Sequence, residues 1–282
     1  MSDIADAPPL TIDQAIANLQ QTDDPGLRYY AAWWIGRFRV NHPDAIAALL
    51  AALEDEQDRS PDGGYPLRRN AARALGKLDS SLAVPALLKC LDSSDYYVRE
   101  AAAQSLEMLG DPAAVPGLLN LLAGGVEAAI AVPDKPHLVQ PYNAIIEALG
   151  TLGDWPLVPE IIPFLDHDQP QVRNAAARAL YQLTGKPEYA ERLVEVLYCP
   201  DLQLRRSALM DLGAVGYGPA AGAIARTLAE NSMKLIALKG VLERQLCPDD
   251  FEGRLEDYAK RFDPLSLSAP AIETMALMDS LL

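Results

Sequence analysis

Apolar and polar positions follow a helical period along almost the whole chain. Stretches such as 45–53, 98–106 and 172–180 place Ala and Leu three and four residues apart, while Val, Ile and Thr do not gather into the alternating runs of strands. The pattern predicts an all-α protein. The apolar run at 45–53 is far shorter than the roughly 18 residues of a membrane span, so no span is expected.

One short pattern recurs along the chain: an apolar residue, a basic residue and then small residues. The copies begin at Leu27, Leu67, Val98, Pro141 (a degenerate copy), Val172, Leu204 and Met233, at spacings of 40, 31, 43, 31, 32 and 29 residues. A period near 31 with two insertions is typical of a solenoid of paired helices. Each copy is predicted to be the second helix of a pair. The residues predicted to cap these helices are Asp24, Asp95, Asp168 and Asp201.

The copy at 98–106, Val-Arg-x-Ala-Ala-Ala-x-x-Leu, resembles the second helix of a HEAT repeat. The resemblance extends over roughly 11–282 and implies a right-handed, crescent-shaped α-solenoid of HEAT-like helical pairs. We therefore treat 1–282 as a single solenoid in which each repeat packs only on its neighbours. The acidic start, Met1–Asp6, has no apolar run and is not expected to be a secretory signal.

Two polar, turn-rich insertions interrupt the period, near 57–66 and 124–138. Both fall between the two helices of a pair, so both are expected to leave the solenoid on the same side. Insertions on one side often frame a binding face. Tolerated surface loops are the other interpretation, and the sequence leaves both open.

The charges are distributed unevenly. The net charge of -15 argues against general nucleic-acid binding. The 84 residues in the seven second helices nevertheless hold 14 Lys and Arg against 5 Asp and Glu, a balance of +9. Six of these basic residues occupy the position directly after the start of a repeat. For those six we favour a structural ladder that pairs with Asp residues between the helices over a binding role.

The second and sixth positions after each repeat start are predicted to face solvent, opposite the alanine stripe. Their aromatic, basic and carboxylate side chains suit a flat anionic ligand, because aromatics stack, arginines bind carboxylates and a glutamate exchanges protons. The candidate site residues are Tyr29, Trp33, Arg69, Arg73, Glu100, Asn143, Glu147, Asn174 and Arg178.

An aromatic cluster at 29–38 departs most from the repeat. Tyr30 and Trp34 stand where a generic unit carries Ala or Ser, and we interpret them as sealing the open end of the core. Tyr29 and Trp33 lie on the other side of the helix. We interpret those two as contacts to a ligand or to another subunit.

The aromatic cluster, the length of 282 residues and the ending at 275–282 together resemble the E subunit of the E/F-type phycobilin lyases. That family implies an enzyme, a carbon–sulfur lyase subunit active with an F-type partner. The heterodimer attaches an open-chain bilin through a thioether to a cysteine of an antenna protein. In the part of the family that this chain resembles most, the bilin is phycocyanobilin and the antenna protein is the phycocyanin alpha subunit of the phycobilisome. The chain itself is expected to be cytoplasmic.

The resemblance also implies roles for the candidate residues. Tyr29 and Trp33 would stack on the bilin or the partner, and Glu100 or Glu147 would handle the proton. The remaining bilin-binding candidates are Arg69, Arg73 and Arg178, which would hold the propionates, with Asn143 and Asn174. The bilin is a substrate, no cofactor is expected, and the acceptor supplies the thiol.

Several alternatives remain open at this point. The isomerising motif Asn-His-Cys-Gln-Gly-Asn of the F partner in related enzymes is absent here, which still allows an E subunit of an isomerising pair. A HEAT scaffold without chemistry and a chaperone or adaptor for antenna proteins are the other functions. The sequence also leaves open the bilin, the acceptor, the E–F interface and the oligomeric state of the chain alone, for which a homo-oligomer is one option. The aromatic cluster and residues 249–282 are the candidate contacts for the E–F interface.

Histidine and cysteine give no sign of a metal site or a nucleophile. His42, His137 and His167 lie in different repeats and are interpreted as loop residues rather than ligands. The three cysteines are far apart in sequence and suit a reducing cytoplasm.

Overall fold

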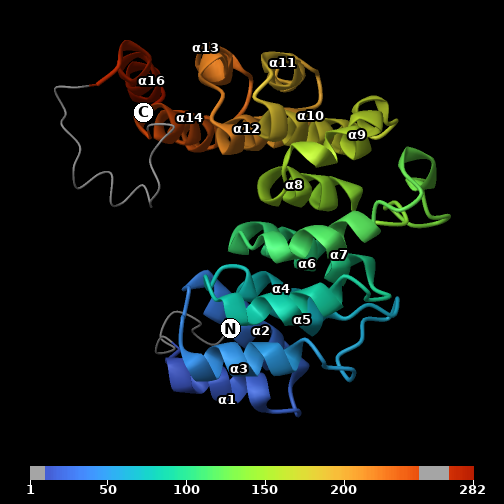
Figure 1. Cartoon of the computed structure of the whole chain (residues 1–282). Coiled ribbons are helices and arrows are strands. Elements are labelled where there is room, and N and C mark those ends of the chain that lie inside the picture. The colour runs from blue at the N-terminus through green and yellow to red at the C-terminus, as the bar shows by residue number, and fades with distance from the viewer. Residues whose placement is uncertain (1–9, 248–266) are drawn as a thin grey trace. The chain divides into compact units, whose positions relative to one another are not determined.

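The computed structural model describes residues 10–247 and 267–282, and within them the chain is helical (Figure 1). The one β feature of the described part is an isolated bridge between Ala131 and Leu138. All seven predicted second helices are present: α2 (Pro25–Arg37), α4 (Pro66–Leu75), α6 (Tyr96–Leu109), α8 (Tyr142–Leu152), α10 (Pro170–Thr184), α12 (Leu202–Val215) and α14 (Asn231–Leu246). The all-α, paired-helix prediction is confirmed.

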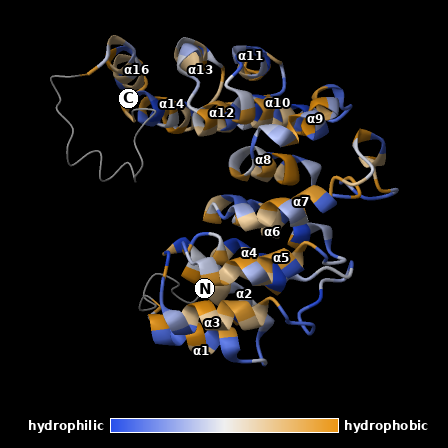
Figure 2. Cartoon of the chain, in the orientation of Figure 1, coloured by the Kyte–Doolittle hydropathy of each residue, from blue (hydrophilic) through white to orange (hydrophobic). Residues whose placement is uncertain are grey.

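A first helix precedes each second helix. These first helices are α1 (Ile12–Gln20), α3 (Pro43–Ala52), α5 (Val84–Cys90), α7 (Val115–Asn120), α9 (Val158–Ile161), α11 (Pro187–Val196) and α13 (Ala221–Arg226), and α16 (Ala269–Asp279) follows the last pair. The first helix is the shorter one in every pair except α3 and α4, which have equal lengths. Hydrophobic and hydrophilic residues share most helices (Figure 2), as expected when one face packs on a neighbour. No helix in residues 10–247 or 267–282 has the length and apolar character needed to cross a membrane.

Packing contacts divide the chain into two compact units, Met1–Gly153 and Asp154–Leu282. In the first, α2, α4, α6 and α8 pack on one another in chain order. In the second, α10, α12 and α14 do the same, and α16 packs on α13 and α14. A single solenoid over 1–282 stays a prediction. The predicted features at Met1–Asp6 and in most of 249–282 lie outside the described residues.

Small residues set the spacing between second helices. A Cβ atom on Gly36 of α2 would lie 2.8 Å from the Cα atom of Ala74 in α4, and one on Gly213 of α12 would lie 2.8 Å from the Cα atom of Ala237 in α14. The helices therefore cross too closely for a side chain at these points. In the sequence each of these glycines directly follows an apolar residue, Ile35 and Leu212.

Three of the four predicted caps are confirmed. Asp24, Asp95 and Asp201 each accept a hydrogen bond from a backbone N–H in the first turn of the helix that follows. The prediction for Asp168 is wrong, because α10 starts at Pro170 and its N-cap is Gln169. Pro170 sets the backbone for the first turn without a side-chain cap.

The basic ladder is structural, as favoured, but its partners are mostly not aspartates. Arg28 pairs with Asp55 at 2.7 Å. Arg68, Arg99, Arg173 and Arg205 instead donate to backbone carbonyls of the loops between helices. Carbonyls at helix ends lack partners within the helix, and a guanidinium offers five N–H donors to satisfy them.

Candidate functional site

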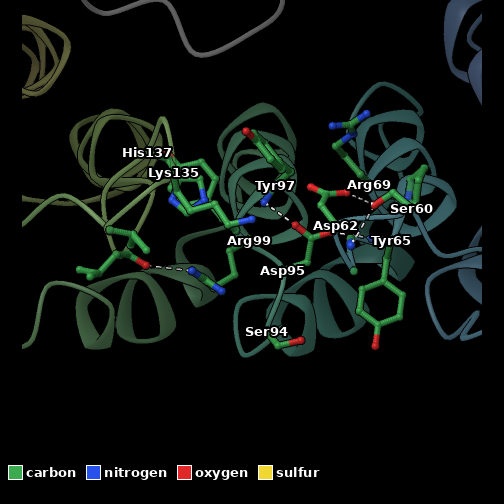
Figure 3. A pocket seen from close by; sticks show the side chains of 16 residues that line it. Ser60, Asp62, Tyr65, Arg69, Ser94, Asp95, Tyr97, Arg99, Lys135 and His137 are labelled. Atoms are coloured by element: carbon green, nitrogen blue, oxygen red, sulfur yellow. Dashed lines mark hydrogen bonds between the residues drawn. The ribbon is translucent and has the colours of Figure 1, made fainter.

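A cavity of about 510 Å³ lies in the first unit, where both insertions meet the start of α6 (Figure 3). We call it the rim cavity. The first insertion contributes 60 and 62–66, and the second contributes Val132, Lys135, His137 and Val139. The remaining lining residues are Arg69 of α4 and Ser94, Asp95, Tyr96, Tyr97 and Arg99 at the start of α6. The prediction that both insertions leave on one side is confirmed, and they frame a space of ligand size.

Asp95 ties the first insertion to α6. Its carboxylate accepts the backbone N–H of Tyr65 at 2.7 Å and that of Tyr97 at 2.8 Å. The ring of Tyr65 lies between two guanidiniums, 4.0 Å from Arg59 and 4.2 Å from Arg68. Cation–π contacts of this kind fix an aromatic ring in place. The first insertion is therefore held by a hydrogen bond to Asp95 and by the contacts of the Tyr65 ring with Arg59 and Arg68.

The second insertion is held by Arg99 and by an aromatic stack. Arg99 donates to the carbonyl oxygen of Val139 at 2.9 Å and to the side-chain oxygen of Gln140 at 2.8 Å. The ring of His137 stacks on Tyr96, with centroids 4.1 Å apart and an interplanar angle of 13°. Arg99 is a ladder residue, so here the ladder also positions a wall of the cavity.

Three predicted site residues come together beside the cavity. Arg69 lines it, with its guanidinium carbon 5.6 Å from the centre of the Tyr97 ring. Arg73, one turn along α4, forms an ion pair with Glu100 of α6 at 3.7 Å. Burial raises the pKa of Glu100, although Arg73, Arg69 and His137 each act to lower it. The group combines two guanidiniums with a carboxyl that holds its proton more tightly than usual.

The two candidate aromatics lie on α2 and do not line the cavity. Tyr29 is 38% exposed and Trp33 is 44% exposed, in line with their predicted side of the helix. The interpretation of Tyr30 as a core seal is wrong, because Tyr30 is 47% exposed and its ring lies 5.5 Å from that of Trp33. Helix α1 packs on α2 and already closes this end, with Leu19 buried in the core. Trp34 is half-buried against Phe38.

The two candidates on α8, Asn143 and Glu147, are half-buried. Helix α8 packs on α6, so they lie on the helix that neighbours Glu100. They do not line the rim cavity. Their predicted roles remain predictions.

The candidates on α10 are more enclosed than predicted. Asn174 is buried, so its predicted solvent position is wrong. It lines a crevice of about 350 Å³ between α10, α11 and Leu204 of α12, because this part of α10 faces the next repeat. Arg178 forms an ion pair with Asp211 of α12 at 3.7 Å and exposes 13% of its side chain. Both residues serve the packing of the second unit.

Several cavity residues were not singled out from the sequence, among them Tyr65, Tyr97, Lys135 and His137. For Tyr65, Lys135 and His137 the available signal was their position inside an insertion. Tyr97 lies at the start of α6, where no such signal was present. His137 is a loop residue as predicted, yet it faces the cavity (Figure 3). No set of His, Cys, Asp and Glu side chains in the described ranges is arranged to hold a metal ion.

Family models match most of the chain. The HEAT repeats model matches 59–131 and 140–232, and the PBS lyase HEAT-like repeat model matches 27–55. The chain is 59% identical over 282 residues to the phycocyanobilin lyase subunit alpha of Picosynechococcus sp., with 100% of both sequences covered. It is 58% identical to the protein of the same name from Synechocystis sp., covering 98% of this chain and 97% of the relative.

Two further comparisons refine the relationship. The bilin biosynthesis protein PecE of Nostoc sp. is 46% identical over 85% of this chain and 89% of its own length, a lower identity than the lyase alpha subunits show. The complex of CpcE and CpcF of phycocyanin lyase from Nostoc sp. PCC7120 contains a similar chain. It superposes with a TM-score of 0.88 at 56% identity and covers 100% of this chain and 98% of that one.

Proposed function

Because the chain belongs to the phycocyanobilin lyase alpha-subunit family, we propose that it is one subunit of a two-protein lyase. With an F-type partner it attaches phycocyanobilin through a thioether to a cysteine of the phycocyanin alpha subunit. The observation that carries this function is full-length identity of 59% to a phycocyanobilin lyase subunit alpha. The similar chain in the solved CpcE–CpcF complex supports a heterodimer.

Phycocyanobilin enters this proposal as a substrate, with no resident cofactor. The acceptor cysteine supplies the nucleophile, so the lyase needs no reactive thiol of its own. Cys90 fits that division of labour, because burial raises its pKa to about 11 and keeps it a protonated thiol. The task left to this chain is to hold the bilin, exclude wrong geometries and assist proton transfer.

The rim cavity and the adjoining face of α4 and α6 are our proposed bilin contact. Arg69 and Arg73 bind the propionates, because a guanidinium matches a carboxylate with two parallel hydrogen bonds. Glu100 supplies a proton to the bilin, a role suited to a carboxyl whose pKa burial has raised. Tyr29, Trp33, Asn143 and Glu147 remain candidate contacts. Arg178 is left out, because it pairs with Asp211 and exposes only 13% of its side chain, whereas the side chain of Arg73 is 41% exposed. Asn174 is left out because it is buried.

The proposal includes a cytoplasmic location, where phycocyanobilin and its acceptor would meet. The described cysteines, Cys90, Cys199 and Cys247, are all free. Free thiols of this kind are stable in a reducing compartment.

Co-expression with the F-type partner, phycocyanobilin and the phycocyanin alpha subunit tests the function. A covalent adduct, detected by zinc-enhanced fluorescence after denaturing electrophoresis, is the expected result. A complex that binds the alpha subunit and the bilin without forming an adduct would instead indicate a scaffold or adaptor.

The proposed propionate contacts are tested with Arg69→Gln and Arg73→Gln combined. Loss of two charged hydrogen-bonding groups is expected to weaken bilin binding by the complex at least 10-fold, measured by absorbance titration. Arg226→Gln, at an exposed position of α13, is the control for a loss of positive charge. Unchanged bilin affinity in the double variant would remove both residues from the site.

A further inference from the structure

The hydrogen-bond partner of the His137 imidazole indicates its tautomer. Its Nδ1 atom lies 2.8 Å from the carbonyl oxygen of Leu138. A carbonyl oxygen only accepts hydrogen bonds, so Nδ1 carries the hydrogen. In the neutral ring Nε2 then bears the lone pair. A histidine whose Nδ1–H is held by a carbonyl is arranged to accept a proton at Nε2.

The position of the ring is fixed as well. One face of the imidazole stacks on Tyr96 at 4.1 Å, and the ring of Tyr97 meets it edge-on at 5.8 Å. Arg99 holds the returning strand of the same insertion at Val139. His137 therefore cannot turn freely in solvent, as a loop histidine usually does. A proton acceptor fixed in this way is set up for transfer in a bound complex.

Charged and titratable groups share the surroundings of His137. Tyr96 and Tyr97 contact its ring, and Glu100 interacts with it electrostatically. The other such groups that line the same cavity are Asp62, Tyr65, Arg69, Asp95, Arg99 and Lys135. Glu100 and His137 are close enough to affect each other electrostatically. A candidate proton acceptor, His137, and a candidate proton donor, Glu100, therefore lie close to each other.

We propose that Nε2 of His137 accepts the thiol proton of the acceptor cysteine as its sulfur adds to the bilin. This inference rests on the proposed lyase function. In the step, the S–H bond and the π bond of the A-ring ethylidene group break. A C–S bond forms at the exocyclic carbon, and a C–H bond forms at the adjoining ring carbon, with its proton supplied by Glu100. The proton on His137 then returns to Glu100 through solvent, so no oxidant or reductant is needed.

A structural role is the competing explanation, because His137 also helps to hold the second insertion. His137→Asn separates the two. The Asn amide keeps a donor near the position of Nδ1 but has no group at the position of Nε2. His42→Asn is the matched control, since His42 caps α3 and does not line the cavity.

The experiment uses the full lyase complex with bilin and apo-acceptor. For His137→Asn we expect the attachment rate to fall about 100-fold, the usual range for loss of a general base, with bilin affinity changed less than twofold. Added imidazole should restore part of the rate, because it re-supplies the missing base. His42→Asn should keep the wild-type rate and show no response to imidazole.

Two results would overturn the proposal. One is a wild-type attachment rate in His137→Asn. The other is a lost rate that imidazole does not restore, together with faster proteolysis in 130–138, which would assign His137 a structural role. Absence of adduct with the wild-type complex is a separate outcome, and it would refute the lyase function itself.

Discussion

At the scale of single residues, the pKa values of two carboxyl groups in the first unit, Glu100 and Asp55, are shifted in opposite directions. Burial raises the pKa of Glu100 above its usual value. The folded protein therefore binds that proton more tightly than the unfolded chain, and stability falls as pH rises through the window between the ordinary and the raised pKa. Glu100→Gln removes this penalty. At pH 7.5 we expect it to increase the free energy of unfolding by on the order of 1 kcal/mol, with no difference remaining below about pH 4.

Asp55 provides the contrast within the same experiment. Burial alone would raise its pKa, but hydrogen bonds from the backbone N–H of Asp58 and from Arg28 bring it below the ordinary value. Its contribution to stability is present above the ordinary pKa and disappears as pH falls. Asp55→Asn should therefore lose roughly 1–3 kcal/mol at neutral pH. Urea unfolding at pH 7.5 and pH 4 measures both variants. A clearly destabilised Glu100→Gln at pH 7.5 would contradict the assignment for Glu100.

The sequence predicted which helix residues lie near the rim cavity better than it predicted their surroundings. Helical spacing alone indicated Arg69, Arg73 and Glu100, because position on a regular helix decides which side a residue faces, but all three are half-buried. Asn174 and Arg178 have the same spacing but are enclosed, since neighbouring repeats cover that face of α10. His137 lies in an insertion that does not follow the helical period, so the sequence could not predict that its side chain lines the cavity.

At the scale of helices, the crossing of α12 and α14 depends on glycine. A Cβ atom on Gly240 would overlap the carbonyl oxygen of Gly213. Gly240→Ala must therefore push the two helices apart, and we expect a loss of about 3 kcal/mol. Gly222→Ala in α13 is the matched control, because the nearest atom to its new Cβ is the flexible guanidinium of Arg226 at 3.2 Å. That variant should be neutral or slightly more stable. Equal unfolding midpoints for the two variants would refute the close crossing.

The second insertion is expected to depend on Arg99 more than on its own short hairpin. Arg99→Gln loses the contacts to Val139 and Gln140, so limited proteolysis should cut within 130–138 several times faster. Arg173→Gln removes the equivalent ladder residue of α10, where the preceding loop has no insertion. The control should leave that cutting rate unchanged. Equal cutting in both variants would mean that another contact holds the insertion.

Helices were more predictable than the insertions for a physical reason. Seven copies of one pattern reinforce each other, so the second helices were located from the repeat starts to within a few residues. The insertions at 57–66 and 124–138 carry no period. Their shape depends on contacts with distant residues such as Asp95 and Arg99. The rim cavity exists only through those contacts, and the sequence indicated its side but not its lining.

At the scale of the whole molecule, the ladder changes the meaning of the charge pattern. The second helices carry a balance of +9 in a chain of net charge -15. Five ladder arginines are occupied by carbonyls or by Asp55, so they are not available to a ligand. The basic residues that remain in the first unit include Arg69 and Arg73, beside the cavity. The positive charge available at the proposed bilin contact is therefore local rather than spread along the helices.

A second surface of the first unit suits a protein partner. Tyr30, Trp33 and Phe38 are exposed on or just after α2, beside Arg37. Tyrosine, tryptophan and arginine are the residue types that contribute most at protein interfaces, and monomers rarely leave such a set uncovered. In a chain whose family works as a heterodimer, the F-type subunit is the partner we assign to this surface.

Replacing two of these aromatics tests that assignment. Trp33→Gln with Phe38→Ser should weaken binding of the F-type subunit at least 100-fold by calorimetry, because each lost aromatic contact contributes about 2 kcal/mol or more at the centre of an interface. The same variant should reduce self-association of the isolated chain in light scattering. The two substitutions make the apolar patch on and just after α2, which is exposed when the partner is absent, more polar. Leu228→Gln, which changes an 81% exposed side chain in the second unit, is the control for lost surface hydrophobicity. Partner affinity unchanged by the double variant would leave Trp33 to the bilin and place the heterodimer contact elsewhere on the chain.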